Sequence, residues 1–260
     1  ETALDTLIRG VMTPYLILGI FLFIFGIVVR YSMLPELDAK DVNKSTSGKV
    51  DTRTSIFQYP WLILGALAIF FHVGSQMISL ATIIDYAGTM GLPLEGNAKN
   101  FPSFTMFFTF LGYLSGIVLI PKFLNQRNAL LICSFLGLLF SLLTIFTTGK
   151  VNVFGLETDI SIWFLVLMGY SNALIYTGIW PLAIRDLGKY TNLGSSFLVM
   201  GLCGSAILPL IFSYVVDLNS SLPLFDAYKI AYWVLVPCFL YLLFFATVGH
   251  KIEHWGKHKA

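Results

Sequence analysis

The sequence predicts an all-α integral membrane protein with seven transmembrane helices, and two observations lead to this fold class. Of the 260 residues, 57% are hydrophobic and only 12% are charged, with a mean hydropathy of +0.79. Soluble domains carry about 25% charged residues, so this composition excludes an ordinary soluble protein. Apolar runs of about 20 residues, the length that crosses a bilayer as a helix, also recur along the whole chain.

The apolar runs define the expected helices in order. Seven spans are predicted, at residues 11–32, 60–88, 102–120, 128–148, 160–184, 194–217 and 227–249. Before them lies a short polar segment, Glu1 to Arg9, that leads directly into the first span without an initiator methionine. This start favours one piece of a longer polypeptide.

The longest polar stretch, residues 33–58, carries mixed charges and small residues, which is typical of a linker. It separates one helix from a group of six. Twelve Lys and Arg residues fall in the connections on one side of the predicted spans and four on the other. The side with more positive charge faces the cytoplasm, so we expect the chain to start outside and the tail, residues 250–260, to lie inside.

One face of the second span carries His72, Gln76 and Ser79 at positions i, i+4 and i+7. An unpaired polar group in hydrocarbon costs several kcal/mol, so this face should point to other helices or water. For Ser79 we expect an interhelical hydrogen bond. For Gln76 we expect ligand contact, because an amide offers donors and an acceptor to a hydroxyl-rich ligand. His72 either titrates near neutrality or is a satisfied core residue.

Asn172, Tyr176 and Trp180 follow at four-residue spacing in the fifth span, which places an amide, a phenol and an indole on one helix face. Amides that bond hydroxyls and flat rings that stack on C–H faces suit an uncharged polar ligand such as a sugar. The alternative for Trp180 is an aromatic residue at the membrane interface.

Small residues and prolines mark expected helix contacts and kinks. Gly112 with Gly116, and Gly201 with Gly204, form stripes that allow close helix approach. Three prolines inside later spans should kink their helices: Pro181, Pro209 and Pro237.

Several kinds of chemistry lack support in the sequence. The four aspartates at or near span ends leave no carboxylate in the middle of any span: Asp85, Asp159, Asp217 and Asp226. A proton-coupled carrier usually keeps a carboxylate there, so a proton-carrying group would lie in sequence outside this chain.

The sequence has no catalytic motif, no phosphate-binding motif and no metal-ligand set, and its cysteines have no paired spacing. A net charge of +2 gives no reason to expect nucleic acid. We therefore expect no enzyme and no cofactor.

The stretch Ile179 to Met200, IWPLAIRDLGKYTNLGSSFLVM, resembles the fucose:proton symporter family of the major facilitator superfamily, including its bacterial glucose/galactose members. Phe71 to Gln76, FHVGSQ, is similar to the seventh helix of that family. The resemblance implies the sixth helix of an N-terminal half at 1–32, a cytoplasmic interdomain linker at 33–58, and a C-terminal six-helix domain at 59–249. A missing N-terminal half would complete a twelve-helix carrier.

The same resemblance implies a carrier in the bacterial inner membrane that moves a hexose or deoxyhexose together with a proton by alternating access. Gln76 and Asn172 would face the sugar, with Trp180 as a neighbour. Three alternatives stay open: a major-facilitator carrier for a drug or metabolite, a seven-helix receptor or photoreceptor, and a membrane sugar sensor that moves nothing. A retinal protein fits poorly because Lys229 lies at the edge of the last span.

Overall fold

The computed structural model describes residues 2–31, 55–93, 97–120, 122–153 and 155–254. The chain divides into two units, Glu1–Thr46 and Ser47–Ala260. The first unit contains one long helix, α1 (Thr2–Tyr31), of which Pro14–Tyr31 is apolar enough to cross a membrane. The predicted linker at residues 33–58 lies outside the described residues except for its last four, and the end of the predicted tail lies outside them as well.

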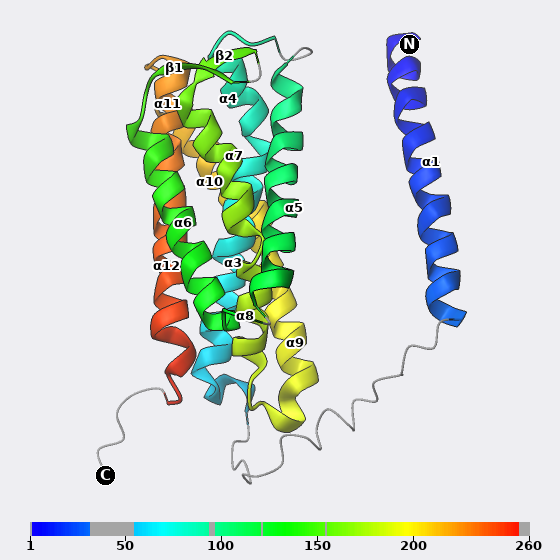
Figure 1. Ribbon diagram of the computed structural model, residues 1–260, viewed down its shortest axis with the longest axis vertical. Coiled ribbons are helices and arrows are strands. Elements are labelled where there is room, and N and C mark those ends of the chain that lie inside the picture. Colours follow the sequence, from blue (N-terminus) through cyan, green and yellow to red (C-terminus); the bar gives the residue numbers. More distant parts are fainter. Residues whose placement is uncertain (1, 32–54, 94–96, 121, 154, 255–260) are drawn as a thin grey trace. The chain divides into compact units, whose positions relative to one another are not determined.

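The second unit is a bundle of helices (Figure 1). Its helices are α3 (Pro60–Ala81), α4 (Ile83–Thr89), α5 (Phe101–Leu119), α6 (Gln126–Phe146), α7 (Ile160–Asn172), α8 (Ile175–Ile184), α9 (Thr191–Met200), α10 (Gly204–Leu218), α11 (Leu224–Ala231) and α12 (Leu235–Thr247). Short 3₁₀ turns lie at Ile56–Gln58, Ala98–Asn100, Gly188–Tyr190, Gly201–Cys203, Tyr232–Val234 and Gly249–Lys251.

The seven predicted spans are confirmed, since seven helical stretches in the described residues are long and apolar enough to cross a membrane. The spans of α1, α3, α5 and α6 each contain one uninterrupted α-helix, whereas the three later spans are each divided into two helices. The divisions fall at 173–174, 201–203 and 232–234, a few residues before Pro181, Pro209 and Pro237. The interruptions therefore precede the prolines at which kinks were expected.

Helix α3 packs against the α9–α10 region through backbone contacts that only glycine permits. A Cβ atom on Gly204 would stand 2.0 Å from the Phe70 carbonyl oxygen, and one on Gly201 would stand 2.6 Å from the Ala66 carbonyl oxygen. Facing them, a Cβ atom on Gly74 would meet Leu208 at 2.2 Å. The expected role of the Gly201–Gly204 stripe in close helix approach is confirmed.

The stripe on α5 brings that helix against the junction of α7 and α8. A Cβ atom on Gly112 would lie 2.6 Å from the Cβ of Ala173, and one on Gly116 would lie 2.4 Å from Leu174. On the other side of the contact, Gly169 lies against the carbonyl oxygen of Thr105. The α7–α8 junction therefore packs directly against the face of α5 that carries Gly112 and Gly116.

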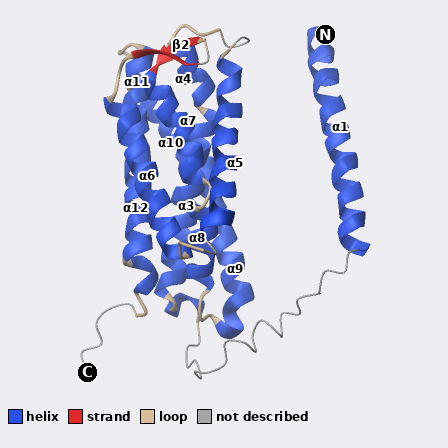
Figure 2. Ribbon diagram, in the orientation of Figure 1, coloured by secondary structure: helices blue, strands red, loops and turns tan. Residues whose placement is uncertain are grey.

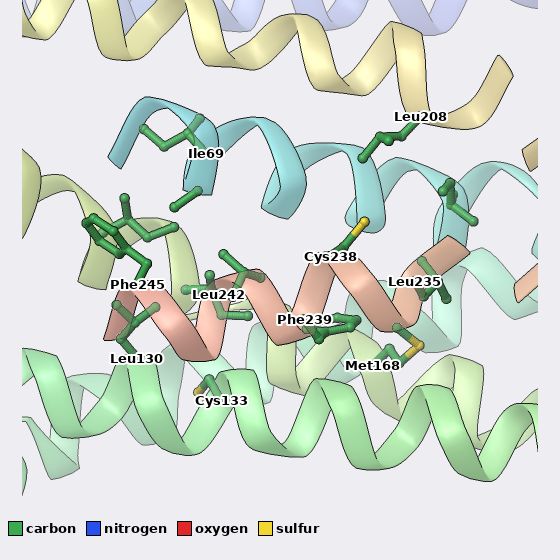
Figure 3. Packing of buried hydrophobic residues seen from close by; sticks show 14 of the residues in the cluster. Ile69, Leu130, Cys133, Met168, Leu208, Leu235, Cys238, Phe239, Leu242 and Phe245 are labelled. Carbon is green, nitrogen blue, oxygen red and sulfur yellow. The ribbon is translucent and has the colours of Figure 1, made fainter. Parts of the chain in front are cut away.

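A buried apolar core joins α3, α6, α7, α10 and α12 (Figure 3). Leu130 and Cys133 reach it from α6, and Cys238 and Phe239 reach it from α12 (Figure 3). The ring of Phe239 fills the space above Gly137, where a Cβ atom would come within 2.2 Å of it. These contacts pack α6 and α12 closely against each other.

A two-stranded antiparallel hairpin, β1 (Lys150–Val153) and β2 (Leu156–Asp159), connects α6 to α7 at one end of the bundle, here termed the hairpin end (Figure 2). It is an addition to the expected all-helical chain. Gly155 at its tip has a φ of +79°, which favours glycine. Asp159 ends the hairpin, and its carboxylate accepts hydrogen bonds from the backbone N–H groups of Ser161 (2.9 Å) and Gly149 (2.8 Å).

Replacing Asp159 with alanine is expected to lower the free energy of unfolding by about 1–2 kcal/mol, because it removes the N-cap of α7 and leaves two backbone donors unpaired. Thermal unfolding of the purified full-length protein in detergent measures the effect. Asp159→Asn keeps one of the two acceptor oxygens, so it should lose less stability than Asp159→Ala. An unchanged unfolding temperature for Asp159→Ala would show that these two hydrogen bonds do not stabilise the protein.

Candidate functional site

His72 and Gln76 lie on the face of α3 that points to α8. Gly65 contacts Ala183 of α8, and His72 and Gln76 follow Gly65 by seven and eleven residues, so all three share one side of the helix. His72 is 1% exposed and its Nδ1 has no hydrogen-bond partner, whereas Gln76 is half-buried. The histidine is therefore not a fully satisfied core residue in this structure.

Ser79, on the same face, does not make the interhelical bond expected of it. Its hydroxyl donates to the carbonyl oxygen of Gln76 at 2.8 Å, within α3 itself. A serine in a helix readily bonds the carbonyl of the preceding turn, and that local bond competes with any bond to a neighbouring helix. Because Ser79 bonds the backbone carbonyl of Gln76, the side-chain amide of Gln76 remains able to hydrogen-bond a ligand near the end of α3.

Asn172 is the last residue of α7 and lies at the interruption between α7 and α8. It is 2% exposed, and neither its Nδ2 nor its Oδ1 atom has a hydrogen-bond partner. A buried amide without partners costs free energy, so residues of this kind need an external partner or a second conformation to be satisfied. This is the property expected of a residue that binds a polar ligand.

Contacts between α3 and α8 fix the relative height of these groups. The two helices run antiparallel, with Gly65 against Ala183 and the indole N–H of Trp61 donating to the Arg185 carbonyl oxygen at 3.0 Å. Because helices rise by the same amount per residue, counting from these contacts places Gln76 level with Asn172 and His72 level with Tyr176. The polar groups predicted on two separate spans therefore share one depth in the bundle.

Tyr176 and Trp180 lie together on α8, with ring centroids 5.7 Å apart and ring planes inclined at 32°. Both are half-buried, so each keeps part of its ring surface accessible. The interruption at 173–174 separates them from Asn172, so the three residues do not follow one continuous helix as the spacing predicted. The aromatic pair still lies directly beyond the amide along the chain.

Ser134 on α6 is a further polar residue at this depth that the sequence reasoning missed. It is fully buried and its hydroxyl has no partner. Leu130, one turn earlier on α6, lies against the position of a Cβ atom on Gly178 of α8, which places Ser134 level with Asn172 and Leu174. The only signal in the sequence was a serine within an apolar run, which by itself is ordinary.

Charged groups stay away from this level. Asp85, Asp217 and Asp226 belong to α4, α10 and α11, near the hairpin end, and Asp159 caps α7 there. Lys229 is bound at the same end, its Nζ donating to the Thr147 carbonyl oxygen at 2.6 Å. Within the described ranges, no three His, Cys, Asp or Glu side chains gather as a metal site would require. The middle of the bundle can therefore contact an uncharged polar ligand through amide, imidazole, hydroxyl and ring groups.

The chain is similar in sequence to bacterial sugar transporters. It is 27% identical over 254 residues to a putative glucose/galactose transporter of Helicobacter pylori J99, covering 94% of this chain and 56% of that protein. It is 24% identical over 244 residues to a glucose/galactose transporter of Brucella abortus, covering 93% and 54%. It is 26% identical over 224 residues to the L-fucose-proton symporter of Escherichia coli K12, covering 84% and 48%. The chain thus spans about half the length of the curated relatives it matches.

The fold matches solved structures of the E. coli fucose:proton symporter. The alignment has a TM-score of 0.71 at 23% identity and covers 92% of this chain and 55% of that one. A second structure, in the outward conformation, gives 0.69 with similar coverage. No protein-family model matches the chain. The matches confirm the resemblance to glucose/galactose transporters and fucose:proton symporters, and the chain is a multi-pass membrane protein with a major-facilitator fold.

Proposed function

We propose that this chain is the C-terminal part of a secondary transporter that carries a hexose or deoxyhexose together with a proton by alternating access. The similarity to sugar transporters over more than four fifths of the chain supports this proposal. The observation that carries it is the buried, unpartnered amide of Asn172 level with Gln76, since an uncharged hydroxylated ligand supplies the donors and acceptors that such amides lack.

In this proposal, residues 1–32 are the sixth helix of an N-terminal half, 33–58 the cytoplasmic linker, 59–249 the C-terminal domain and 250–260 a cytoplasmic tail. The alignment to about half of each relative supports a further half outside this chain. The distribution of Lys and Arg supports a chain that starts outside and ends in the cytoplasm. The bacterial relatives support a location in a bacterial inner membrane.

The sugar would bind between this domain and the other half, at the depth of Gln76 and Asn172. Their amides would hydrogen-bond the hydroxyl groups, and the rings of Tyr176 and Trp180 would stack on its C–H faces. His72, level with Tyr176, would offer an imidazole to the same ligand. Since the described spans hold no carboxylate at this level, the proton would be carried by groups in the other half.

Transport by the full-length protein in proteoliposomes tests this function. Uptake of labelled glucose, galactose or fucose is expected to rise several-fold when the outside is made acidic, and to collapse when a protonophore removes the gradient. Uptake of none of the three sugars, with transport of another solute, would instead make it a carrier of a different class. Sugar binding without counterflow would make it a sensor.

A further inference from the structure

Three positively charged side chains from three parts of the chain gather at the end of the bundle opposite the hairpin. Arg127 lies in the first turn of α6, Arg185 directly follows α8, and Lys251 ends the 3₁₀ turn after α12. All three charges lie close enough to act on the buried imidazole of His250, and no carboxylate in the described ranges does so. The surroundings of His250 therefore carry net positive charge.

The guanidinium group of Arg127 is held in position without being neutralised. Its Nε donates to the carbonyl oxygen of Ala246 in the last turn of α12, at 3.3 Å. Asp186 pairs with Arg185 at 3.2 Å, whereas neither Arg127 nor Lys251 has an ion pair within the described residues. The amino end of α6 adds a partial positive charge, because no acidic residue lies in its first turn and its N-cap side chain makes no bond. Two cations and a helix end thus lack a counter-ion in the part of the chain that the structure describes.

An exposed apolar stripe along α6 and α12, which lie side by side in Figure 1, leads to the same cations. At the hairpin end it begins with the exposed rings of Phe146 and Trp233, whose centroids lie 5.6 Å apart. Counting down the two antiparallel helices from this contact places Arg127 within about one residue of the level of Lys251. Between these ends the stripe consists of six side chains that are each at least 39% exposed: Ile132, Phe135, Leu139, Leu240, Phe244 and Val248. This set is termed the α6–α12 stripe.

We propose that the α6–α12 stripe binds an anionic phospholipid, with the phosphate group at Arg127 and Lys251 and the acyl chains along the apolar side chains. From Arg127 to Leu139, α6 rises by about 18 Å at 1.5 Å per residue, and one leaflet of hydrocarbon is about 15 Å thick. The Nη groups of a guanidinium suit phosphate oxygens, and Lys251 adds a second charge. This end is the one proposed to face the cytoplasm, where the leaflet carries negative charge. The lipid site is separate from the proposed sugar site and does not depend on the solute carried.

Native mass spectrometry of the full-length protein, titrated with phosphatidylglycerol or with zwitterionic phosphatidylcholine in detergent, measures the Kd for each lipid. The unmodified protein is expected to bind phosphatidylglycerol at least tenfold more tightly than phosphatidylcholine. Arg127→Gln and Lys251→Gln should each weaken phosphatidylglycerol binding about fivefold, the contribution of one cation near a lipid surface, and leave phosphatidylcholine binding unchanged. Glutamine at 127 keeps a side-chain N–H donor, and Lys251 is exposed, so Lys251→Gln tests the site even if Arg127→Gln does not fold.

Lys189→Gln is the matched control, because Lys189 is an exposed cation that lies over the ring of Tyr190 at 5.0 Å and is not among the charges that act on His250. It should bind phosphatidylglycerol like the unmodified protein. Equal weakening by Lys189→Gln and Lys251→Gln, or equal affinity of the unmodified protein for the two lipids, would overturn the proposal.

Soluble glycerol phosphate distinguishes a lipid site from a site for free phosphate. It should bind at least a hundredfold more weakly than phosphatidylglycerol, because it has no acyl chains to lie along the α6–α12 stripe. Binding as tight as that of the lipid would refute the assignment to a phospholipid. No sugar is present in these titrations, so failure of the proposed transport function would leave their results unaffected.

Discussion

Replacing Gly204 with alanine is expected to lower the free energy of unfolding by about 3 kcal/mol or more. The added methyl group would stand 2.0 Å from the Phe70 carbonyl oxygen, a backbone atom of α3 that cannot turn aside as a side chain could. Overpacking typically costs 1–3 kcal/mol, and forced separation of two helix backbones lies at the upper end or beyond. The gain of about 1 kcal/mol in helix propensity does not offset this cost.

Thermal unfolding of the purified full-length protein, followed by circular dichroism or by a thiol-reactive dye, measures this loss. Gly149→Ala is the matched control, because a Cβ atom on Gly149 would meet nothing within 4 Å. The control should unfold at nearly the wild-type temperature. An unchanged midpoint for Gly204→Ala would show that α3 and α10 can separate freely at this contact.

Gln76→Ala and Asn172→Ala are each expected to weaken sugar binding by about 1–3 kcal/mol, a roughly 5- to 150-fold rise in Kd, because each removes hydrogen bonds to a buried ligand. Neither amide has a hydrogen-bond partner within the described residues, so folding should lose little in either variant. Isothermal titration of the full-length protein with the transported sugar measures the change.

Met77→Ala is the control for these variants, since Met77 is 38% exposed and adjoins Gln76 on α3 but carries no group that hydrogen-bonds strongly. It should bind the sugar with unchanged affinity. If Gln76→Ala and Asn172→Ala also bind normally, the two amides do not contact the sugar and the proposed site must lie elsewhere.

Hydropathy predicted the seven spans because helix length and apolar content follow directly from the bilayer thickness. The residues Gln76 and Asn172 could also be selected from the sequence, because an amide in an apolar span is costly and must be explained. The expected close helix contacts at Gly112 and Gly201 likewise followed from residue size alone. Their assignment to a sugar site stays a prediction.

The interruptions within the spans could not be predicted, because the residues at 173–174 are Ala and Leu, which favour helix. Their irregular geometry depends on the surface of α5 against which they pack, and that surface is distant in sequence. Ser134 was missed and Ser79 misassigned for a related reason. A serine bonds its own helix or a neighbour according to packing, and residue type does not distinguish the two.

The bond from the indole of Trp61 to the Arg185 carbonyl joins the first turn of α3 to the residue that follows α8. One turn further along α3, Gly65 contacts Ala183 of α8, so the two helices are in contact at two points near these ends. If α8, which is about 15 Å long at 1.5 Å per residue, is displaced, these two contacts favour movement of the lower part of α3 with it. Because α3 is one continuous helix from Pro60 to Ala81, Gln76 on α3 and Tyr176 on α8 would then move together.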